Sequence, residues 1–267
     1  MPLRRIVILA VAALVSAGAC SSSPTGRPQL AFKSEQDMRK MGEQTFTQIK
    51  AQTPQSRDGE SIRVILCVAE AITSRLPADE RGAGWEVVVF DDNAVNAFAL
   101  PGNKIGVYEG IFRAARNQDQ LAAVIGHEVA HVIAHHANER VSTATATQLG
   151  VNVAQAAAGG SGTYGGQAAG LLGAGATMGV ILPFNRKQES EADVVGLDLM
   201  AKAGFNPDQA IPLWENMSRI GKEKPPEFMS THPSDETRLN GLKKALPGAE
   251  KLYTEAQAKG FQPSCGF

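Results

Sequence analysis

The chain has 267 residues, which is enough for one large domain or two small ones. Its formal net charge is −1 and 43% of its residues are hydrophobic, so no strong electrostatic field is available to attract nucleic acid or acidic substrates. The composition therefore argues against a nucleic-acid-binding protein and leaves other partners open.

The start of the chain has the features of an export signal. A basic pair at 4–5 precedes an apolar stretch at 6–15 that is too short to span a bilayer comfortably. Three small residues then lead directly to Cys20, an arrangement similar to a lipobox, in which this cysteine becomes the lipidated first residue of the mature protein. We expect a signal peptide over 1–19 and a flexible, lipidated tether over 20–33. An ordinary signal peptide cleaved nearby is the alternative.

This interpretation predicts a location and a mode of attachment. A lipoprotein of this kind faces the periplasm, and Ser21 rather than aspartate after Cys20 favours the outer membrane over the inner one. Because the mature chain is mildly acidic, we expect acyl chains rather than charge to hold it to the membrane.

Export would also place the chain where disulfides form. Beyond Cys20 the only cysteines are Cys67 and Cys265. Two cysteines without a spacing signature leave two alternatives open. They form one disulfide, or Cys67 is buried and Cys265 is a free thiol.

The first part of the mature chain reads as two helices followed by a small sheet. Helical periodicity predicts helices over 34–52 and 61–76, with a polar break between them. Residues 85–90 form a short β-prone run, and 96–108 contains the turn-like sequence 101–103, which predicts two further strands. Extended peptides commonly bind along an exposed strand. Four residues are therefore candidates for substrate binding: Asn96, Ala97, Phe98 and Ala99. An internal hairpin without this role is the alternative.

The stretch GHEVAHVIAHHANER, residues 126–140, holds four of the five histidines of the chain. A helix that begins after the N-cap Asn117 and runs to about Val141 would place His127 and His131 one turn apart on the same side. Both imidazoles can then bind one metal ion. Glu128 lies about 100° round the helix, close enough to address a water on that ion.

These residue types suit a hydrolytic zinc site. Two imidazoles and one carboxylate bind Zn²⁺ and leave a fourth position for water, whose pKa falls to about 7. Glu128 could take the proton of that water and return it to a leaving amine. The alternative is a helix that carries HExxH by chance, without metal. Ala134 and Ala137 stand where the longer HExxHxxGxxH pattern needs glycine and histidine, so the third ligand must lie elsewhere.

His135 also follows His131 by one turn of the same predicted helix. Three histidines at this spacing would spread over about 12 Å of helix axis, too far for one ion. We therefore expect His135 to be solvated or to support a ligand.

A second helix is predicted to begin at Arg186. Glu189 and Asp193 are four residues apart and share a face, whereas Glu191 points elsewhere. Glu189 is the better candidate for the third ligand, and Asp193 for orienting a ligating histidine. The alternative is a solvated acidic first turn that the helix dipole stabilises.

Three separated motifs resemble metallopeptidase family 48, which includes the HtpX heat-shock protease, the zinc CAAX prenyl endopeptidase and periplasmic assembly-enhancing proteases. They are HEVAH at 127–131, ESEAD at 189–193 and STHP at 230–233, and NAFALPG at 96–102 adds to the likeness. The likeness covers most of the mature chain. It implies the following roles: zinc ligands His127, His131 and Glu189, catalytic carboxylate Glu128, an oxyanion-stabilising or metal-capping His232, and supporting residues His136, Asp193 and Arg238.

The rest of the chain is less informative. No charged residue occurs between Val141 and Asn185, so 143–185 is predicted to form small-residue helices or a flap near the active site. Contact with a membrane is the minority alternative for this segment. Later residues read as helices, interrupted at 225–226, with a C-terminal tail at 251–267.

Together these observations predict a single domain over 34–250. Its fold class is α+β and mainly α-helical, a gluzincin-like zincin with a small β-sheet next to the HExxH helix. The predicted function is that of an endopeptidase with one Zn²⁺ per subunit, acting on misfolded or misassembled proteins of the bacterial cell envelope. The alternative is a chaperone-like outer-membrane assembly factor whose zinc site is latent and capped by His232.

Overall fold

The computed structural model describes residues 20–157, 184–220, 227–232 and 236–267. The predicted signal peptide lies outside these residues, as do positions 158–183 of the predicted flap and the break at 225–226. The helices and strands are, in chain order, β1 (Cys20–Ser22), β2 (Pro28–Leu30), α2 (Glu35–Gln52), α3 (Gly59–Thr73), α4 (Ala78–Arg81), β3 (Glu86–Phe90), β4 (Ala97–Leu100), β5 (Lys104–Tyr108), η1 (Glu109–Arg113), α5 (Gln118–Ile133), α6 (His136–Ala157), α8 (Arg186–Lys202), η2 (Pro207–Gln209), α9 (Ala210–Ile220), α10 (Glu227–Thr231) and α11 (Glu236–Ala258).

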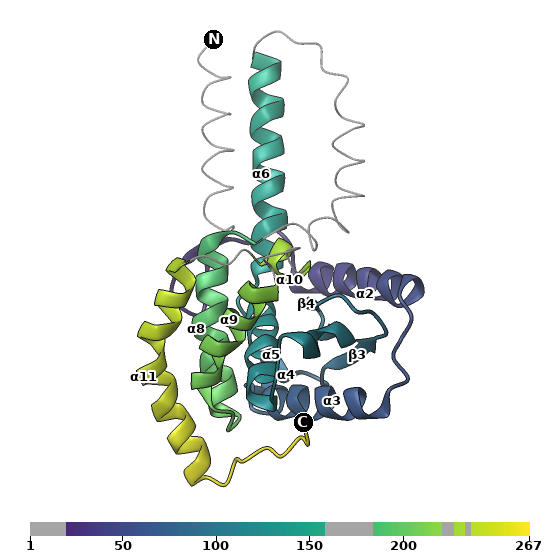
Figure 1. Cartoon of the computed structure of the whole chain (residues 1–267). Coiled ribbons are helices and arrows are strands. Elements are labelled where there is room, and N and C mark those ends of the chain that lie inside the picture. Colours follow the sequence, from purple (N-terminus) through teal and green to yellow (C-terminus); the bar gives the residue numbers. More distant parts are fainter. Residues whose placement is uncertain (1–19, 158–183, 221–226, 233–235) are drawn as a thin grey trace.

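Helix α5 is the centre of the fold. It packs against β4 and α3 on one side and against α8 and α9 on the other, with α11 lying outside α8 (Figure 1). Between Gln120 and His131 every residue of α5 except Ala123 is buried. A helix that is buried on nearly all sides belongs to the interior of a domain. The predicted α+β, mainly helical fold with a small sheet beside the HExxH helix is confirmed.

The small sheet has the strand order β3-β5-β4. Strand β3 runs parallel to β5, and β4 is antiparallel to it, with Ala97 opposite Val107 and Leu100 opposite Lys104. The turn between β4 and β5 has left-handed backbone at Gly102 (φ 85°) and Asn103 (φ 62°), which glycine and asparagine tolerate best. The predicted hairpin therefore exists, and β4 forms an edge of the sheet next to α5.

One apolar core joins early and late parts of the chain. It extends from Val64 on α3 through Ile125 on α5 and Met200 on α8 to Cys265 near the C-terminus. Cys67 and Cys265 form a disulfide in the structure. The first half of the C-terminal segment 251–267 is helical, as its sequence allows, because α11 continues to Ala258, with its buried Ala249 and Ala256 on the inner side.

The helix predicted to run from Asn117 to about Val141 is two helices. Helix α5 ends at Ile133, and α6 begins at His136 after His135, whose backbone is left-handed with φ 53°. The carbonyl of Ala134 instead accepts a hydrogen bond of 2.8 Å from the buried side chain of Gln29. This region has no proline or glycine that would mark the break. The side-chain hydrogen bond at the break comes instead from Gln29, far away in the chain.

The flexible tether predicted over 20–33 is instead ordered over β1 and β2. These two strands form an antiparallel hairpin whose turn is closed by hydrogen bonds between Ser23 and Arg27 and between Gly26 and Ser23. Polar side chains of the hairpin form hydrogen bonds with α6 and α8, and these bonds stabilise the ordered hairpin. We call residues 20–30 the N-terminal hairpin.

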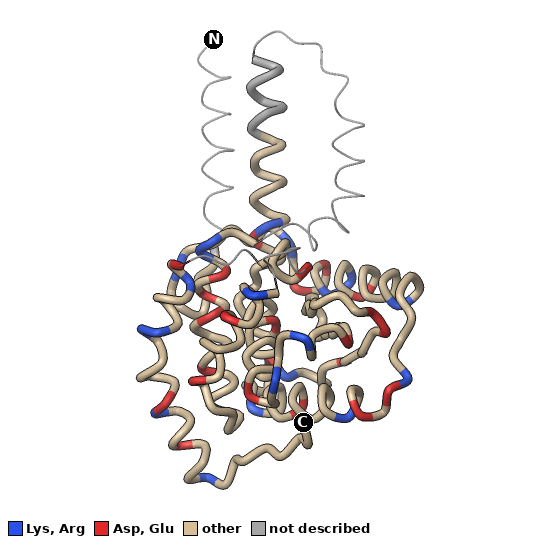
Figure 2. The backbone as a smooth tube through the Cα atoms, in the orientation of Figure 1, with Lys and Arg blue, Asp and Glu red and all other residues tan. Residues whose placement is uncertain are grey.

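Helix α6 extends away from the body of the molecule (Figure 1). Charged residues are spread over the body, and α6 has none beyond Arg140 (Figure 2). Within the described residues, no helix combines the length and the apolar character needed to cross a bilayer.

Candidate metal centre

Two histidines of α5 form the first half of the centre. The Nε2 atoms of His127 and His131 lie 3.1 Å apart, one helical turn from each other, as the HExxH spacing predicts. Both side chains are buried, with 3% and 2% of their surface exposed. Their rings therefore face a shared interior point rather than solvent.

Glu189 reaches the same point from α8. Its Oε1 lies 3.4 Å from Nε2 of His131, and its Oε2 lies 3.5 Å from Nε2 of His127. Helix α8 begins with a capping box between Asn185 and Gln188, which places Glu189 in the first turn. The carboxylate is fully buried, so Glu189 does not belong to a solvated acidic turn.

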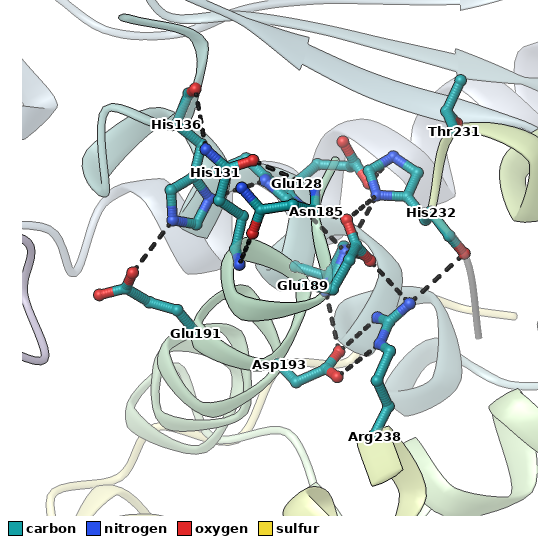
Figure 3. Close-up of polar contacts among 12 residues, drawn as sticks. Glu128, His131, His136, Asn185, Glu189, Glu191, Asp193, Thr231, His232 and Arg238 are labelled. Atoms are coloured by element: carbon teal, nitrogen blue, oxygen red, sulfur yellow. Dashed lines mark hydrogen bonds and ion pairs between the residues drawn. The ribbon is translucent and has the colours of Figure 1, made fainter. Parts of the chain in front are cut away.

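His232 completes the group. It follows α10, and its Nδ1 lies 3.3 Å from Nε2 of His127 and 3.1 Å from Oε1 of Glu189 (Figure 3). Its other ring nitrogen, Nε2, lies 3.4 Å from Oε1 of Glu128. One ligand atom from each of His127, His131, Glu189 and His232 can be chosen so that all lie within 4.8 Å of one another.

The group is compact enough to hold one zinc ion. Ligand atoms of tetrahedral zinc are about 3.3–3.4 Å apart, and several pairs here lie 3.1–3.5 Å apart, with all four atoms within 4.8 Å of one another. Nitrogen and carboxylate oxygen are ligands that zinc accepts. The described residues therefore suit a divalent metal, with zinc as the proposed ion.

Asp193 and Arg238 support the ligands from behind. Oδ1 of Asp193 lies 3.1 Å from Nδ1 of His127, so the carboxylate fixes the proton on that nitrogen and leaves Nε2 free to bind metal. Arg238 holds the carboxylate in a two-pronged pair of 2.6 and 2.7 Å and also lies 2.7 Å from Glu189 (Figure 3). The structure thus brings both predicted supporting residues to the centre.

The two other histidines of the motif take different places. His136 is fully buried, and its Nδ1 lies 2.8 Å from Nδ1 of His131. Its Nε2 lies 3.2 Å from Glu191, the acidic residue that points away from the metal ligands. His135 is 48% exposed and faces Glu35 at 3.3 Å, so the break between α5 and α6 moves it away from the centre.

The electrostatics of the centre favour a positive charge. Burial would lower the pKa of His127, but Asp193 and Glu189 outweigh it and raise the pKa to about 9. Burial would raise the pKa of Glu189, yet its hydrogen bonds with His127, His131 and His232 lower it below its usual range. A buried carboxylate that its imidazole neighbours keep ionised provides the negative ligand that a divalent cation requires.

Glu128 differs from Glu189 in its environment. Burial raises the pKa of Glu128 above its ordinary value, and nearby His232 and His127 only partly oppose this. A smaller lowering contribution comes from a hydrogen bond with the backbone of Ala99 on β4. The centre therefore has one ionised carboxylate among its ligand atoms and one carboxylate tuned toward proton transfer.

The outer edge of β4 faces this carboxylate. The amide of Tyr108 donates to the carbonyl of Asn96, so alternation along an antiparallel pair turns Asn96 and Phe98 toward β5 and Ala97 and Ala99 toward the outer edge. Of the four predicted substrate-binding residues, only Ala97 and Ala99 thus present their backbone groups outward. The side chain of Phe98 packs against the rings of Phe90 on β3 and Phe46 on α2.

A cavity of about 280 Å³ opens beside the centre. Its lining includes Ala99 of β4, His131 and Arg140 of the two histidine-bearing helices, and Phe184 just before α8. The ring of Phe184 lies against His131 at 3.7 Å between centroids, and the guanidinium of Arg140 lies 3.6 Å from the centroid of the same ring. Sequence reasoning did not assign Phe184 a place in the site, because a lone aromatic in an uncharged stretch carries no spacing signal.

Comparison with known proteins gives a consistent result. The model of peptidase family M48 matches residues 55–246. Mitochondrial metalloendopeptidase OMA1 of Schizosaccharomyces pombe is 40% identical over 170 residues, which are 62% of this chain and 48% of the relative. OMA1 of Arabidopsis thaliana is 34% identical over 230 residues, 84% of this chain and 45% of the relative. The β-barrel assembly-enhancing protease of Escherichia coli is 29% identical over 212 residues, 74% of this chain and 42% of the relative. The chain thus spans about half the length of these relatives or less.

Proposed function

The chain belongs to peptidase family M48, and from this premise we propose that it is a zinc-dependent endopeptidase of the bacterial cell envelope. The observation that carries the proposal is the convergence of the donor atoms of His127, His131 and Glu189 beside the carboxylate of Glu128. A purely structural zinc site would not need a further carboxylate with a raised pKa at this place.

The residues have separate tasks in peptide hydrolysis. Zinc in such a site activates water and polarises a peptide carbonyl. Glu128 accepts the proton of the attacking water on its carboxylate and delivers it to the leaving amine. The raised pKa of this group suits a task that requires both accepting and releasing a proton near neutral pH. The amide of Ala99 already bonds the carboxylate of Glu128, so its carbonyl is the group on the edge of β4 that an extended peptide next to Glu128 would pair with.

Cleavage of an unfolded protein by matched variants tests this function. Wild type should cleave casein or an unfolded outer-membrane protein, and chelation should abolish the cleavage. Glu128→Gln should lower the rate by at least about 10²-fold while its zinc content stays at the wild-type level, because Glu128 transfers protons and is not a ligand. Glu250→Gln, on the exposed side of α11, is the control. Full cleavage by Glu128→Gln would remove the assignment.

A second candidate function has its own supporting observation. His127, His131, Glu189, His232 and Glu128 are all almost completely buried. Nδ1 of His232 lies 3.1 Å from Oε1 of Glu189 and 3.3 Å from Nε2 of His127, so it could take the ligand position that a water would need. This arrangement supports a latent, His232-capped centre in a chaperone-like assembly factor, or an enzyme that rests in that state. Movement of α10 would then be required for cleavage.

His232→Ala separates these possibilities. If His232 caps the centre, its removal should raise cleavage of unfolded protein severalfold. If it stabilises the oxyanion, its removal should lower the rate by about 10²-fold or more. Full cellular function in a Glu128→Gln strain would favour the assembly factor over the peptidase.

The location and the substrates are part of the proposal. We infer a periplasm-facing lipoprotein, held by acyl chains on Cys20 and acting on misfolded or misassembled envelope proteins. A disulfide between Cys67 and Cys265 fits an oxidising compartment, and one relative is named a β-barrel assembly-enhancing protease. The OMA1 relatives are mitochondrial, so fatty-acid labelling of wild type and Cys20→Ser, with fractionation of the cells, is the deciding measurement.

A further inference from the structure

Glu191 connects the N-terminal hairpin with the metal centre. Its Oε1 accepts a hydrogen bond of 2.6 Å from the hydroxyl of Thr25, and its Oε2 accepts one of 3.0 Å from Nε of Arg27. The same Oε2 lies 3.2 Å from Nε2 of His136. Only 5% of Glu191 is exposed, so the carboxylate itself is buried, while Thr25 and Arg27 reach it from the partly exposed hairpin.

The donors and acceptors along this path have one consistent order. A carboxylate paired with arginine only accepts hydrogen bonds, so Nε2 of His136 carries a hydrogen and points it at Glu191. In a neutral imidazole the other nitrogen then accepts, so Nδ1 of His136 receives the hydrogen of Nδ1 of His131 across 2.8 Å. This leaves a lone pair on Nε2 of His131, the atom that lies 3.4 Å from Glu189 at the metal centre.

We propose that the N-terminal hairpin is a positioning element of the metal centre. Thr25 and Arg27 hold Glu191, Glu191 orients His136, and His136 fixes the tautomer and the ring orientation of His131. The inference rests on the metal binding that the proposed function requires, and it does not depend on any particular substrate. Carboxylates and other groups that orient ligating histidines commonly change metal affinity by about 10–100-fold when they are altered.

The hairpin is attached where it can act on both helices of this path. Arg27 makes a fork of 2.6 and 2.8 Å with Glu139 on α6, and Glu139 also accepts from Gln188 on α8 at 2.8 Å. Gln29 donates to the carbonyl of Ala134 at the break between α5 and α6. These bonds fix the start of α6, which carries His136, against the start of α8, which carries Glu191.

The other histidine of the HExxH motif has an equivalent support from a different part of the chain. His127 is oriented by Asp193, which Arg238 of α11 holds in place. His131 is oriented by His136 and Glu191, which Arg27 holds in place. Each ligating histidine thus depends on a buried carboxylate and one arginine, and only the second arginine belongs to the N-terminal hairpin.

The proposal is tested in the full mature chain by variants that keep or remove one hydrogen-bond acceptor on the path from the hairpin to His131. In His136→Asn the amide oxygen stands near the position of Nδ1 and can accept from His131, whereas His136→Leu has a similar size and no acceptor. We expect zinc affinity, measured by competition with a chromophoric chelator, to stay within about fivefold of wild type for His136→Asn and to fall about 10–100-fold for His136→Leu.

Glu191→Gln and Glu139→Gln form the second matched pair. Both change a carboxylate that binds Arg27, but only Glu191 contacts His136. Glu191→Gln should lower zinc affinity about 10-fold or more and change the visible absorption of the cobalt-substituted protein. Glu139→Gln keeps the contact between Glu191 and His136, so it should change both properties less. Urea unfolding of the metal-free variants shows how far each change acts on the fold itself.

Two results would overturn the proposal. One is equal zinc affinity for His136→Asn and His136→Leu. The other is a Glu191→Gln variant with the affinity and the cobalt spectrum of Glu139→Gln. In the hairpin itself, Arg27→Gln should also lower zinc affinity, because Arg27 holds Glu191, and wild-type affinity in this variant would overturn the proposal as well. Zinc binding that follows this order in a protein that cleaves no peptide would contradict the proposed function and support the role of the hairpin, so the two failures are distinct.

Discussion

Gly126 on α5 and Gly196 on α8 cross with their backbones in contact. A Cβ added at Gly126 would lie 2.8 Å from the carbonyl oxygen of Gly196, and one added at Gly196 would lie 2.7 Å from the amide nitrogen of His127. Real Cβ atoms essentially never come this close to backbone. Because α5 and α8 approach so closely, Glu189, about two turns before Gly196, reaches the imidazoles of α5.

Gly196→Ala should therefore damage both the fold and the metal centre. The added methyl group must push the helices apart, and we expect the free energy of unfolding to fall by about 1–3 kcal/mol and zinc affinity to fall with it. Urea unfolding of the metal-free protein and chelator competition measure the two effects. Gly241→Ala is the control, because a Cβ there meets nothing within 4 Å in α11 and should stabilise the helix by about 0.4–1 kcal/mol. Equal stability of the two variants would contradict the close crossing as the cause.

Arg238→Met tests the buried charge cluster. The guanidinium is 2% exposed and pairs with Asp193 and Glu189, so its removal leaves two buried carboxylates without their cation. Breaking a buried pair in this way costs about 3–5 kcal/mol of unfolding free energy, read from the urea midpoint of the metal-free protein. Combining it with Asp193→Leu should restore part of the stability, because both buried charges of the pair are then gone.

The same double variant should not recover its zinc affinity. Asp193 orients His127 through its Nδ1, and leucine cannot accept that hydrogen. In the double variant the free energy of unfolding should therefore recover in part, whereas the zinc affinity should stay low. A double variant that regains both would show that Asp193 acts on the fold alone.

The local part of the metal centre follows from sequence spacing, and the rest depends on tertiary contacts. HExxH places His127 and His131 on one side of a helix by periodicity alone, and ESEAD places Glu189 and Asp193 on one face of another. Neither pattern shows that the helices cross at Gly126 and Gly196. The prediction that they meet depended on the family likeness rather than on the spacing.

Two features of the fold could not be predicted locally. The break between α5 and α6 has no glycine or proline, and it is stabilised by Gln29, which lies 105 residues before Ala134. The segment 20–30 has the composition of a linker, with serine, proline and glycine. Its Arg27 nevertheless forms ion pairs with carboxylates on α6 and α8. Propensity favours a flexible chain there, and long-range ion pairs override it.

The disulfide gives a prediction on stability. Cys67 of α3 is joined to Cys265, which lies 198 residues later, so the bridge closes most of the chain into one loop. Replacing both cysteines by alanine should lower the free energy of unfolding by about 2–5 kcal/mol in non-reducing buffer. Reductant should lower the melting temperature of wild type toward that of the double variant and leave the variant unchanged. Reductant that moves neither protein would show that the bridge does not form in solution.

Glu86 gives a prediction on acid stability that is independent of the metal centre. Its two carboxylate oxygens each lie 2.7 Å from a lysine ammonium, that of Lys50 on α2 and that of Lys104 on β5. Hydrogen bonds with Lys104, and then with Lys50, hold the pKa of Glu86 below its ordinary value of 4.5. A carboxylate whose pKa is lower in the folded state contributes stability above its unfolded pKa and loses that contribution as the pH falls through the folded pKa.

Glu86→Gln should therefore be less stable than wild type at pH 7. The difference should begin to shrink as the pH falls through 4.5, the ordinary pKa of this carboxyl group, and should disappear below its lowered pKa in the folded state. The side chain is 38% exposed, so solvent screening limits the effect to about 1 kcal/mol, and 1 M salt should reduce it further. Urea unfolding across pH 3–7 in wild type, Glu86→Gln and the exposed control Glu250→Gln measures it. Protonated glutamate and neutral glutamine both lack the charge that pairs with the lysines, so a difference caused by these pairs must vanish in acid. If the stability difference between wild type and Glu86→Gln were the same at pH 3 and pH 7, the lysine pairs would not be its source.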